Sequence, residues 1–402
     1  MTRMKYLHLL AFLLIATAMN AQSPALPEAV ASIHESVKAS YAPDGRVAMF
    51  LPSYTVDGQH IMICGKTTSR NASVELEKQL KEKGYTVINC MKVLPDEAQL
   101  GEEIWGIVKN SVCNIRSAAD YGAENVTQGL MGMPVRILEK NRWLHIQTPD
   151  GYLGWVENAA IQRVTKSALE AWNSATKVVV TALWGQVLTA PDNQSAAMGD
   201  VVAGNRLKLI GKKGKFFHVE YADGRKGFLP LSLAMEQNKW RKQLDNSASA
   251  ILKTGQSLIG IPYIWAGLSS KGADCSGFVR STLFMHDIII PRDASQMCHK
   301  GQRLEIGDFS TLQPGDLLFF GSRNKETGKE RVSHVGFYLG NKRFIHSLGN
   351  VHENSFDPQS EDYDAYNWGR LLFAGRVLPF INKEDGLSTT DKNPFYSIHL
   401  DF

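Results

Sequence analysis

The stretch Asp274-Cys275-Ser276-Gly277-Phe278 places one cysteine between two small polar residues, ahead of an apolar, helix-like run that ends at Phe284. A cysteine in the first turn of a helix lies at the positive end of the helix dipole, which favours the thiolate. Two histidines follow in strand-like surroundings, His334 and His346. The stretch therefore predicts a thiol nucleophile at the start of a helix, followed by strands that carry its base.

A thiol nucleophile needs a base, a group that orients the base, and donors for the oxyanion. His334 opens one alternating apolar strand and His346 closes the next, so two antiparallel strands would bring the imidazoles within hydrogen-bond reach. We assign Cys275 as nucleophile, His334 as base and His346 as the orienting group. Taken singly, each residue is also compatible with a structural role, because a lone buried cysteine is usually an inert small hydrophobe.

Length and composition describe a globular chain of several domains. The 402 residues exceed one ordinary core, and 44% are hydrophobic against 21% charged. The net charge of +4 is small and its lysines and arginines are dispersed, which argues against a nucleic-acid partner. We expect a monomer that makes no stable membrane insertion.

The N-terminus and the cysteines bear on the cellular compartment. Basic residues precede an apolar run from Leu7 to Ala18, which predicts a signal peptide at 1–21 and export to the periplasm or beyond. The five cysteines are too few for a disulfide scaffold, and their odd number suits an exported enzyme with one reactive thiol. Cys64 and Cys90 form either a bridge or two buried free thiols. Cysteine and histidine spacing predicts no metal, and we expect no cofactor.

The segment 22–101 is predicted to be mixed α and β. Helical patterns cover 27–40 and 74–83, and strand patterns cover 46–51, 60–64 and 86–93. We read no chemistry in this segment.

Residues 102–163 and 178–236 form an internal repeat. The run from Trp143 to Val156 aligns without a gap onto the run from Phe216 to Leu229, an offset of 216 − 143 = 73 residues. Each copy shows alternating strands around an Asp-Gly turn, which predicts two small β-barrels. Tyr152 in the first copy is replaced by Arg225 in the second, through either a contact kept by one copy or drift at an exposed turn.

The third part, 245–380, begins with a helix predicted over 247–260. The cysteine helix comes next, followed by strands, so this part is predicted to be α+β with helices packed on an antiparallel sheet. The polar tail, 381–402, is expected to be loose.

Residues 247–378 resemble an NlpC/P60 domain, a papain-like cysteine peptidase domain of bacterial cell walls. The resemblance rests on five motifs, which are Pro262-Tyr263-x-Trp265-x-Gly267, Asp274 to Phe278, Pro291-Arg292-Asp293, Pro314 to Leu317 and Ser333 to Gly336. Ala266 stands where that family usually has glycine. The repeat copies resemble bacterial SH3 (SH3b) domains through Asn114 to Ser117 and Gly151-x-x-Gly154-Trp155-Val156 of the first copy.

The combination resembles γ-D-glutamyl-L-diamino acid endopeptidases of the dipeptidyl-peptidase VI type, which implies a peptidoglycan-derived peptide as substrate. The resemblance implies that Cys275 attacks the γ-D-glutamyl carbonyl and that the Cys275 N–H and the Tyr263 hydroxyl hold the oxyanion. It also implies a pocket for the free ammonium of an N-terminal L-Ala. We expect the ammonium ligands among Asp293, Ser295, Glu124 and Tyr152. Asp274 and Ser276, which flank the nucleophile, are expected to bind the substrate backbone. Asp293 also fits a turn cap, and Glu124 and Tyr152 also fit solvated surface.

Two other functions fit the sequence. One is a broader endopeptidase that grips intact wall through its SH3b copies, and the other is a wall-binding SH3b adaptor without catalysis. The presence of Cys275, His334 and His346 argues against the adaptor.

Overall fold

The computed structural model describes residues 26–397 and residue 399, so the predicted export signal at 1–21 lies outside the described residues. The chain divides into two compact units, Met1–Pro43 with Phe50–Lys92, and Asp44–Met49 with Val93–Phe402. Within the described ranges no helix has the length and apolar character needed to cross a membrane.

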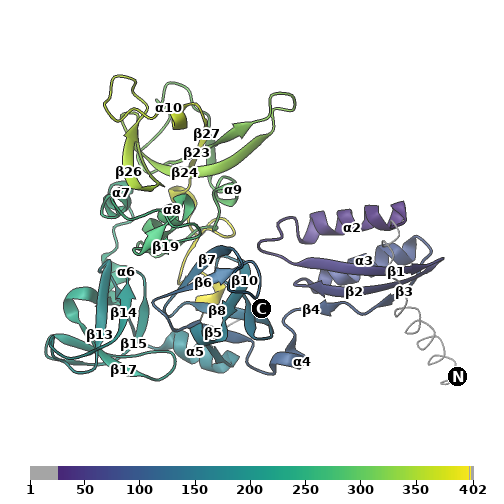
Figure 1. The fold of residues 1–402 in the computed structure, drawn as a ribbon, viewed down its shortest axis with the longest axis horizontal. Helices are drawn as coiled ribbons and strands as arrows, with labels where there is room; N and C mark the ends of the chain where they lie inside the picture. The colour runs from purple at the N-terminus through teal and green to yellow at the C-terminus, as the bar shows by residue number, and fades with distance from the viewer. Residues whose placement is uncertain (1–25, 398, 400–402) are drawn as a thin grey trace. The chain divides into compact units, whose positions relative to one another are not determined.

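The first unit is a small α/β structure (Figure 1, purple). Its sheet has the order β1-β2-β3, with β1 antiparallel and β3 parallel to β2, while β4 also pairs with β2. A disulfide joins Cys64 to Cys90, which settles the open question of their state. The elements are α2 (Glu28–Tyr41), β1 (Phe50–Asp57), β2 (His60–Thr67), α3 (Arg70–Glu82), β3 (Thr86–Asn89) and β4 (Lys92–Val93).

The strand predicted over 46–51 is wrong for most of its length. The Asp44 carboxylate accepts the backbone N–H of Arg46, and the Asp44 carbonyl accepts those of Val47 and Ala48, which makes a tight turn. Aspartate favours such turns because its side chain binds the backbone two residues on. Strand β1 therefore begins only at Phe50, and the segment 44–49 belongs to the second unit.

The internal repeat appears as two seven-stranded antiparallel sheets in the second unit. Their orders are β11-β5-β8-β9-β10-β6-β7 and β14-β13-β17-β16-β15-β12-β18, which are the same order once equivalent strands are matched and one list is reversed. The first contains β5 (Trp105–Val108), β6 (Val112–Arg116), β7 (Asn125–Leu130), β8 (Pro134–Lys140), β9 (Trp143–Gln147), β10 (Leu153–Glu157) and β11 (Ile161–Val164). The second contains β12 (Lys177–Val180), β13 (Trp184–Leu188), β14 (Ala197–Val202), β15 (Arg206–Lys213), β16 (Phe216–Glu220), β17 (Lys226–Pro230) and β18 (Ala234–Glu236).

Short helices connect strands within these sheets and link the sheets to each other and to the neighbouring parts. They are α4 (Glu97–Leu100), η1 (Asn158–Ala160), α5 (Lys166–Ser174), η2 (Leu231–Leu233) and α6 (Gln237–Gln243). Equivalent positions of the two sheets carry the same ring stack, His145 on Trp155 at 4.6 Å and His218 on Phe228 at 4.7 Å between centroids. The shared strand order and stack show that the repeat in sequence is a repeat in structure.

The remaining part packs helices on a six-stranded antiparallel sheet of order β22-β27-β23-β24-β25-β26 (Figure 1, green to yellow). The predicted helix over 247–260 is α7 (Ala248–Gln256), and the cysteine helix is α8 (Cys275–Phe284). The other elements are β19 (Leu268–Ser269), β20 (Gly272–Ala273), β21 (Ile288–Ile289), α9 (Ala294–Met297), β22 (Gln302–Leu304), β23 (Leu317–Arg323), β24 (Glu330–Gly340), β25 (Arg343–Leu348), β26 (Asn350–Ser355), α10 (Ala365–Trp368), β27 (Leu371–Arg376) and η3 (Leu378–Phe380).

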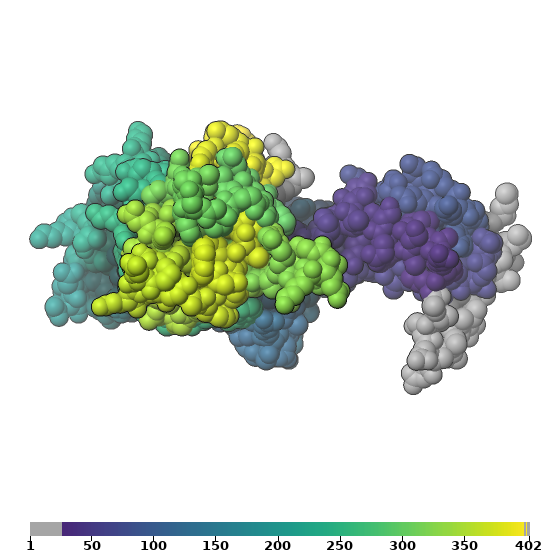
Figure 2. Space-filling view, turned by 90° about the horizontal axis from the view of Figure 1, so that it is seen from above, coloured from purple at the N-terminus to yellow at the C-terminus, as the bar shows by residue number. Residues whose placement is uncertain are grey.

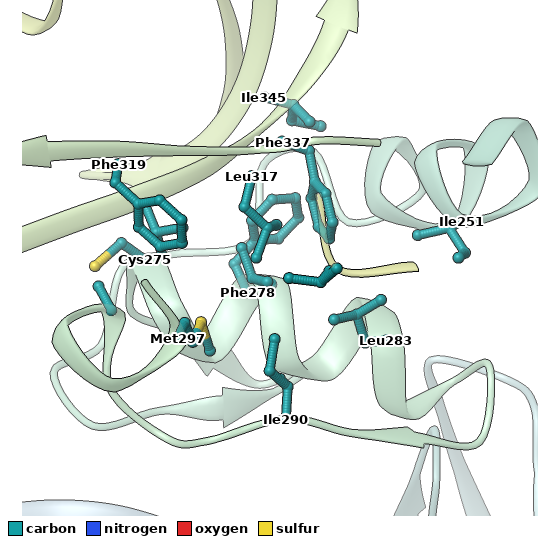
Figure 3. Packing of buried hydrophobic residues seen from close by; sticks show 14 of the residues in the cluster. Ile251, Cys275, Phe278, Leu283, Ile290, Met297, Leu317, Phe319, Phe337 and Ile345 are labelled. Atoms are coloured by element: carbon teal, nitrogen blue, oxygen red, sulfur yellow. The ribbon is translucent and has the colours of Figure 1, made fainter. Parts of the chain in front are cut away.

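Every residue of α8 is buried, which fixes its position against the sheet. Phe278 lies at the centre of a cluster with Phe337 and Leu317, and Cys275 lies at the edge of the same cluster (Figure 3). In the space-filling view, the green to yellow atoms of this part form one continuous face of the second unit (Figure 2). The core therefore holds the nucleophile's helix rigidly beneath strands β23 to β25.

The expectation of a loose tail after Phe380 is wrong for the described residues. Phe395 is 6% exposed and packs edge-on against Trp105, and the Asn173 side chain donates to the carbonyls of Phe395 and Ser397. The tail also forms β28 (Ser388–Thr389), which pairs with β21, and η4 (Pro394–Tyr396). A few apolar residues suffice to dock a mostly polar segment, because burying each of them contributes a favourable free energy of its own.

Replacing Phe395 with alanine should lower the free energy of unfolding of the second unit by about 3 kcal/mol, the usual cost of emptying a buried aromatic site. The measurement is a urea titration followed by tryptophan fluorescence. Ile259→Ala, at a side chain that is 51% exposed, is the control and should change stability by less than about 0.5 kcal/mol. Equal stability of the two variants would contradict the docked tail.

Candidate active site

The backbone around Cys275 is fixed by Asp274, which caps the N-terminus of α8. One Asp274 carboxylate oxygen accepts the N–H of Gly277 at 2.6 Å and the other accepts the N–H of Ala266 at 2.9 Å. Gly277 has no alternative, since a Cβ there would lie 1.9 Å from the carbonyl oxygen of Gly267. Ala266 adopts a φ of 62°, a left-handed conformation that explains why glycine suits this position better.

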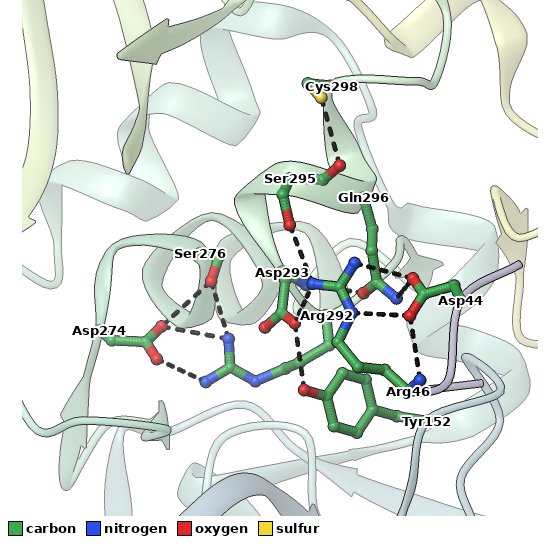
Figure 4. Close-up of polar contacts among 10 residues, drawn as sticks. All are labelled: Asp44, Arg46, Tyr152, Asp274, Ser276, Arg292, Asp293, Ser295, Gln296 and Cys298. Carbon is green, nitrogen blue, oxygen red and sulfur yellow. Dashed lines mark hydrogen bonds and ion pairs between the residues drawn. The ribbon is translucent and has the colours of Figure 1, made fainter. Parts of the chain in front are cut away.

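Arg292 locks this cap from beneath (Figure 4). Its guanidinium donates to both Asp274 carboxylate oxygens, at 3.2 and 2.6 Å, and to the Ser276 hydroxyl at 2.8 Å. The Arg292 side chain is 1% exposed and that of Asp274 is 7% exposed. Asp274 and Ser276 therefore serve to hold Arg292 and the start of α8, and their contact with substrate stays a prediction.

Cys275 is buried, with 8% of its surface exposed. Burial, and then the negative charge of Asp274, raise the pKa of the Cys275 thiol to about 11, while hydrogen bonds from the backbone of Ser276 and Val335 oppose this rise. The expectation that the helix dipole alone would favour the thiolate is therefore wrong for the resting site, because desolvation outweighs it. A base must take the thiol proton.

His334 and His346 are brought together as the strand pattern predicts. They lie on the adjacent strands β24 and β25, and the Nε2 atom of His334 is 2.8 Å from the Nδ1 atom of His346. A bulge in β24, where Ser333 is the extra residue, re-aims the strand at this point. Both imidazoles are buried, at 5% and 0% exposure.

Two residues that the sequence does not single out, Asn354 and His352, set the tautomers of this pair. The Nε2 atom of His346 is 2.9 Å from the Oδ1 atom of Asn354 and 3.2 Å from the Nε2 atom of His352. The amide of Asn354 donates to the carbonyl of Asp362, so its Oδ1 atom faces His346 as an acceptor. His352 places its other ring nitrogen, Nδ1, against the two oxygens of Asn350.

These contacts assign every proton along the chain of rings. Because the Oδ1 atom of Asn354 can only accept, the Nε2 atom of His346 carries a hydrogen and its Nδ1 atom is an acceptor. The Nε2 atom of His334 then donates to His346, which leaves the Nδ1 atom of His334 with a free lone pair. That lone pair fits the predicted role of His334 as the base for the thiol. The pairing of β25 with β26 is a signal in the sequence for the contact between His346 and His352, since a short turn after His346 places the two residues opposite each other.

Tyr263 lies close enough to Cys275 for their charges to interact. Burial first, and then the negative charges of Cys275 and Asp274, raise the pKa of the Tyr263 phenol, so its hydroxyl keeps its proton. The N–H of Tyr263 donates to the Gly349 carbonyl at 2.8 Å, which ties this loop to the turn after β25. A protonated phenol next to the nucleophile suits the predicted oxyanion role.

The predicted ammonium ligands meet in part. The Tyr152 hydroxyl of the first repeat copy donates to the Oδ2 atom of Asp293 at 3.1 Å, so the difference between Tyr152 and Arg225 reflects a contact kept by one copy (Figure 4). Arg46 donates from Nη1 to that same Asp293 oxygen at 2.8 Å and to the Ser295 hydroxyl at 2.9 Å. The sequence does not single out Arg46, because its segment shows no recognisable pattern of catalytic or binding residues.

Glu124 is engaged elsewhere. Its carboxylate accepts the Nε1–H of Trp265 at 2.8 Å, and Trp265 is 60% exposed. Among the hydrogen bonds of the described residues, none joins Glu124 to Asp293. Glu124 therefore contacts the Tyr263 to Gly267 loop through Trp265. Its role as an ammonium ligand stays a prediction.

Residues 260–371 match the NlpC/P60 family, and residues 115–161 match the bacterial dipeptidyl-peptidase SH3 domain. The chain contains an NlpC/P60 domain, the domain of a cysteine peptidase family. Gamma-D-glutamyl-L-lysine dipeptidyl-peptidases are similar to it, at 30% identity over 236 residues for the one from Bacillus cereus and 29% over 230 for the one from Bacillus subtilis. These matches cover 55% of this chain, and 66% and 71% of the respective relatives, so the B. cereus relative is spanned for just under two thirds of its length.

A crystal structure of an NlpC/P60 family protein from Bacillus cereus has the same fold over much of the chain. Its TM-score is 0.58 at 22% identity, and the match covers 68% of this chain and 100% of that one. The likeness shows a shared fold over that part of the chain.

Asn354 is expected to act as a positioning residue for the histidine pair. Asn354→Ala should lower kcat about tenfold, since without this hydrogen bond His346 is no longer held in one tautomer. Asn354→Asp keeps the acceptor but adds a negative charge, which raises the pKa of His346 and should move the acidic limb of the kcat profile to higher pH. Unchanged kcat in Asn354→Ala, together with an unmoved profile in Asn354→Asp, would contradict the assignment.

The pH dependence should reflect the burial of the base. Burial, and then the positive charges of His346, Arg370 and His352, lower the pKa of His334 to about 3. Only neutral His334 can accept the thiol proton, so activity is lost as pH falls through that pKa. We therefore expect the acidic limb of kcat/KM well below the ordinary imidazole value of about 6.5. A half-loss of kcat/KM at pH 6.5 or above would show that the base is solvated.

Proposed function

We propose that this protein is an exported cysteine endopeptidase that hydrolyses the γ-D-glutamyl–diamino acid bond of peptidoglycan-derived peptides with a free N-terminal L-Ala. The observation that carries the proposal is the buried chain from Asn354 through His346 to His334, which leaves one ring nitrogen of His334 as acceptor beside the helix of Cys275. Such a chain serves a thiol nucleophile and has no purpose in a wall-binding adaptor.

The proposed reaction follows from these positions. The Cys275 thiol gives its proton to the Nδ1 atom of His334, and its sulfur forms a bond to the γ-D-glutamyl carbonyl carbon. The tetrahedral oxyanion accepts hydrogen bonds from the Cys275 N–H, which as the first N–H of α8 has no helical acceptor, and from the Tyr263 hydroxyl.

Collapse of the intermediate breaks the C–N bond, and His334 returns its proton to the departing diamino-acid amine. The product is a thioester on Cys275. Water, deprotonated by the same ring nitrogen of His334, then attacks the thioester, which releases the acid and restores the thiol. The contact of His346 with His334 holds the base in one tautomer through both halves of the reaction.

The proposed substrate is supported by the relatives and by the first SH3 domain. Two similar proteins are gamma-D-glutamyl-L-lysine dipeptidyl-peptidases. The hydrogen bond from Tyr152 of the first repeat copy to Asp293 supports a pocket to which this SH3 domain contributes. Export is supported by the Cys64–Cys90 disulfide, since such bonds persist in oxidising compartments.

Purified protein incubated with L-Ala-γ-D-Glu-diamino acid should release L-Ala-D-Glu and the free diamino acid, as detected by mass spectrometry. Cys275→Ala and His334→Ala should each lose this release, by at least about a thousandfold in kcat. The N-acetylated peptide serves as a matched substrate that lacks the ammonium and should be cleaved more slowly. Faster cleavage of intact cross-linked sacculi than of the free tripeptide would favour the broader wall endopeptidase.

A further inference from the structure

The segment 44–49 is built into the catalytic unit, although it lies between two elements of the first unit in sequence. The carbonyl of Arg46 accepts a hydrogen bond from the N–H of Leu153 at 2.7 Å, and the carbonyl of Val47 accepts one from the side-chain amide of Gln147. Met49 packs against a small cluster on the first SH3 sheet that includes Leu153. These contacts fix the backbone of the segment beside the hairpin that carries Tyr152.

The side chain of Arg46 extends from this backbone, and nearly all of its N–H groups donate hydrogen bonds (Figure 4). Its Nε and Nη2 atoms donate to the two carboxylate oxygens of Asp44, each at 2.8 Å. Its Nη1 atom donates to Asp293 and to Ser295. Gln296 in turn donates to Asp44 at 2.7 Å, so both sides of the ion pair are anchored.

The acceptors that Arg46 uses are those that a substrate ammonium would need. A bound ammonium requires a carboxylate and further oxygen acceptors around it. Asp293 and Ser295 are two of the predicted ammonium ligands, and Tyr152 shares the same Asp293 oxygen with Arg46. The guanidinium thus supplies to this pocket the positive charge that the substrate would otherwise bring.

The local charge leads to the same conclusion. Asp44, Asp274 and Asp293 contribute three negative charges, and Arg46 and Arg292 contribute two positive ones, so the cluster carries a net charge of −3 + 2 = −1. Without Arg46 the net charge would be −2. The Arg46 side chain is 39% exposed, so it has room to move toward solvent when a second cation arrives.

We propose that Arg46 is a specificity-determining residue that occupies the ammonium subsite at Asp293, so that the amino terminus of the substrate competes with it. This inference rests on the proposed function, because it concerns the same subsite. Arg46 thereby narrows the difference in kcat/KM between peptides with a free and with a blocked amino terminus, while the free form stays the better substrate.

The test compares kcat/KM for L-Ala-γ-D-Glu-diamino acid with kcat/KM for its N-acetylated form. In Arg46→Met, the ratio of free to acetylated peptide should rise about tenfold over wild type, which corresponds to one charged hydrogen bond regained by the ammonium. Arg46→Lys, which keeps the charge but cannot reach all four acceptors, should give an intermediate ratio. Asp293→Asn in the Arg46→Met background should abolish the gain.

Arg225→Met is the matched control, because Arg225 forms the same kind of pair with an aspartate two residues earlier, on the exposed turn of the second repeat copy. Its ratio should equal that of wild type. A ratio that falls or stays constant in Arg46→Met, while the γ-D-glutamyl bond is still cleaved, would overturn the inference alone and would make Arg46 a support for Asp293. Failure of wild type to cleave that bond would overturn the proposed function and the inference with it.

Discussion

The buried ion pair between Arg292 and Asp274 is the constraint on which the site depends. It holds the carboxylate that caps α8, orders the loop at Ala266 and fixes the backbone on both sides of Cys275. A buried ion pair of this kind adds little net free energy to folding. Removal of one partner, however, leaves the other charge buried without a counter-charge and costs about 3–5 kcal/mol of stability. The pair therefore contributes to this fold mainly by fixing one geometry at the nucleophile.

From that point the site extends outward in two directions. Asp293 follows Arg292 directly in the chain, so the residue that locks α8 also sets the position of the predicted ammonium carboxylate. On the other side, α8 packs under the strands that carry His334 and His346. One rigid frame thus holds the proposed nucleophile, the proposed base and the predicted ammonium carboxylate, as preorganised catalysis requires.

The sequence predicts what is local and leaves out what depends on distant contacts. The start of α8 at Cys275 and the pairing of His334 with His346 are predictable because they follow from local patterns, a helix start and two adjacent strands. Arg46 could not be found, since it meets Asp293 across 247 residues of sequence. The direction of the Cys275 pKa was missed for a similar reason, because desolvation by the whole domain outweighs the local helix dipole. The docked tail depends on a hydrophobic cluster that Phe395 forms with Trp105 of the first SH3 sheet and Trp172 of α5.

The most direct test of the account is to trap the covalent intermediate. Enzyme quenched with acid during turnover of L-Ala-γ-D-Glu-diamino acid should show, by mass spectrometry, an added L-Ala-D-Glu acyl group on the peptide that contains Cys275. The location is decisive because Cys113 and Cys298 are also free thiols. An acyl group on either of those, or turnover of the substrate with no acyl group on Cys275, would contradict the central claim that Cys275 is the nucleophile.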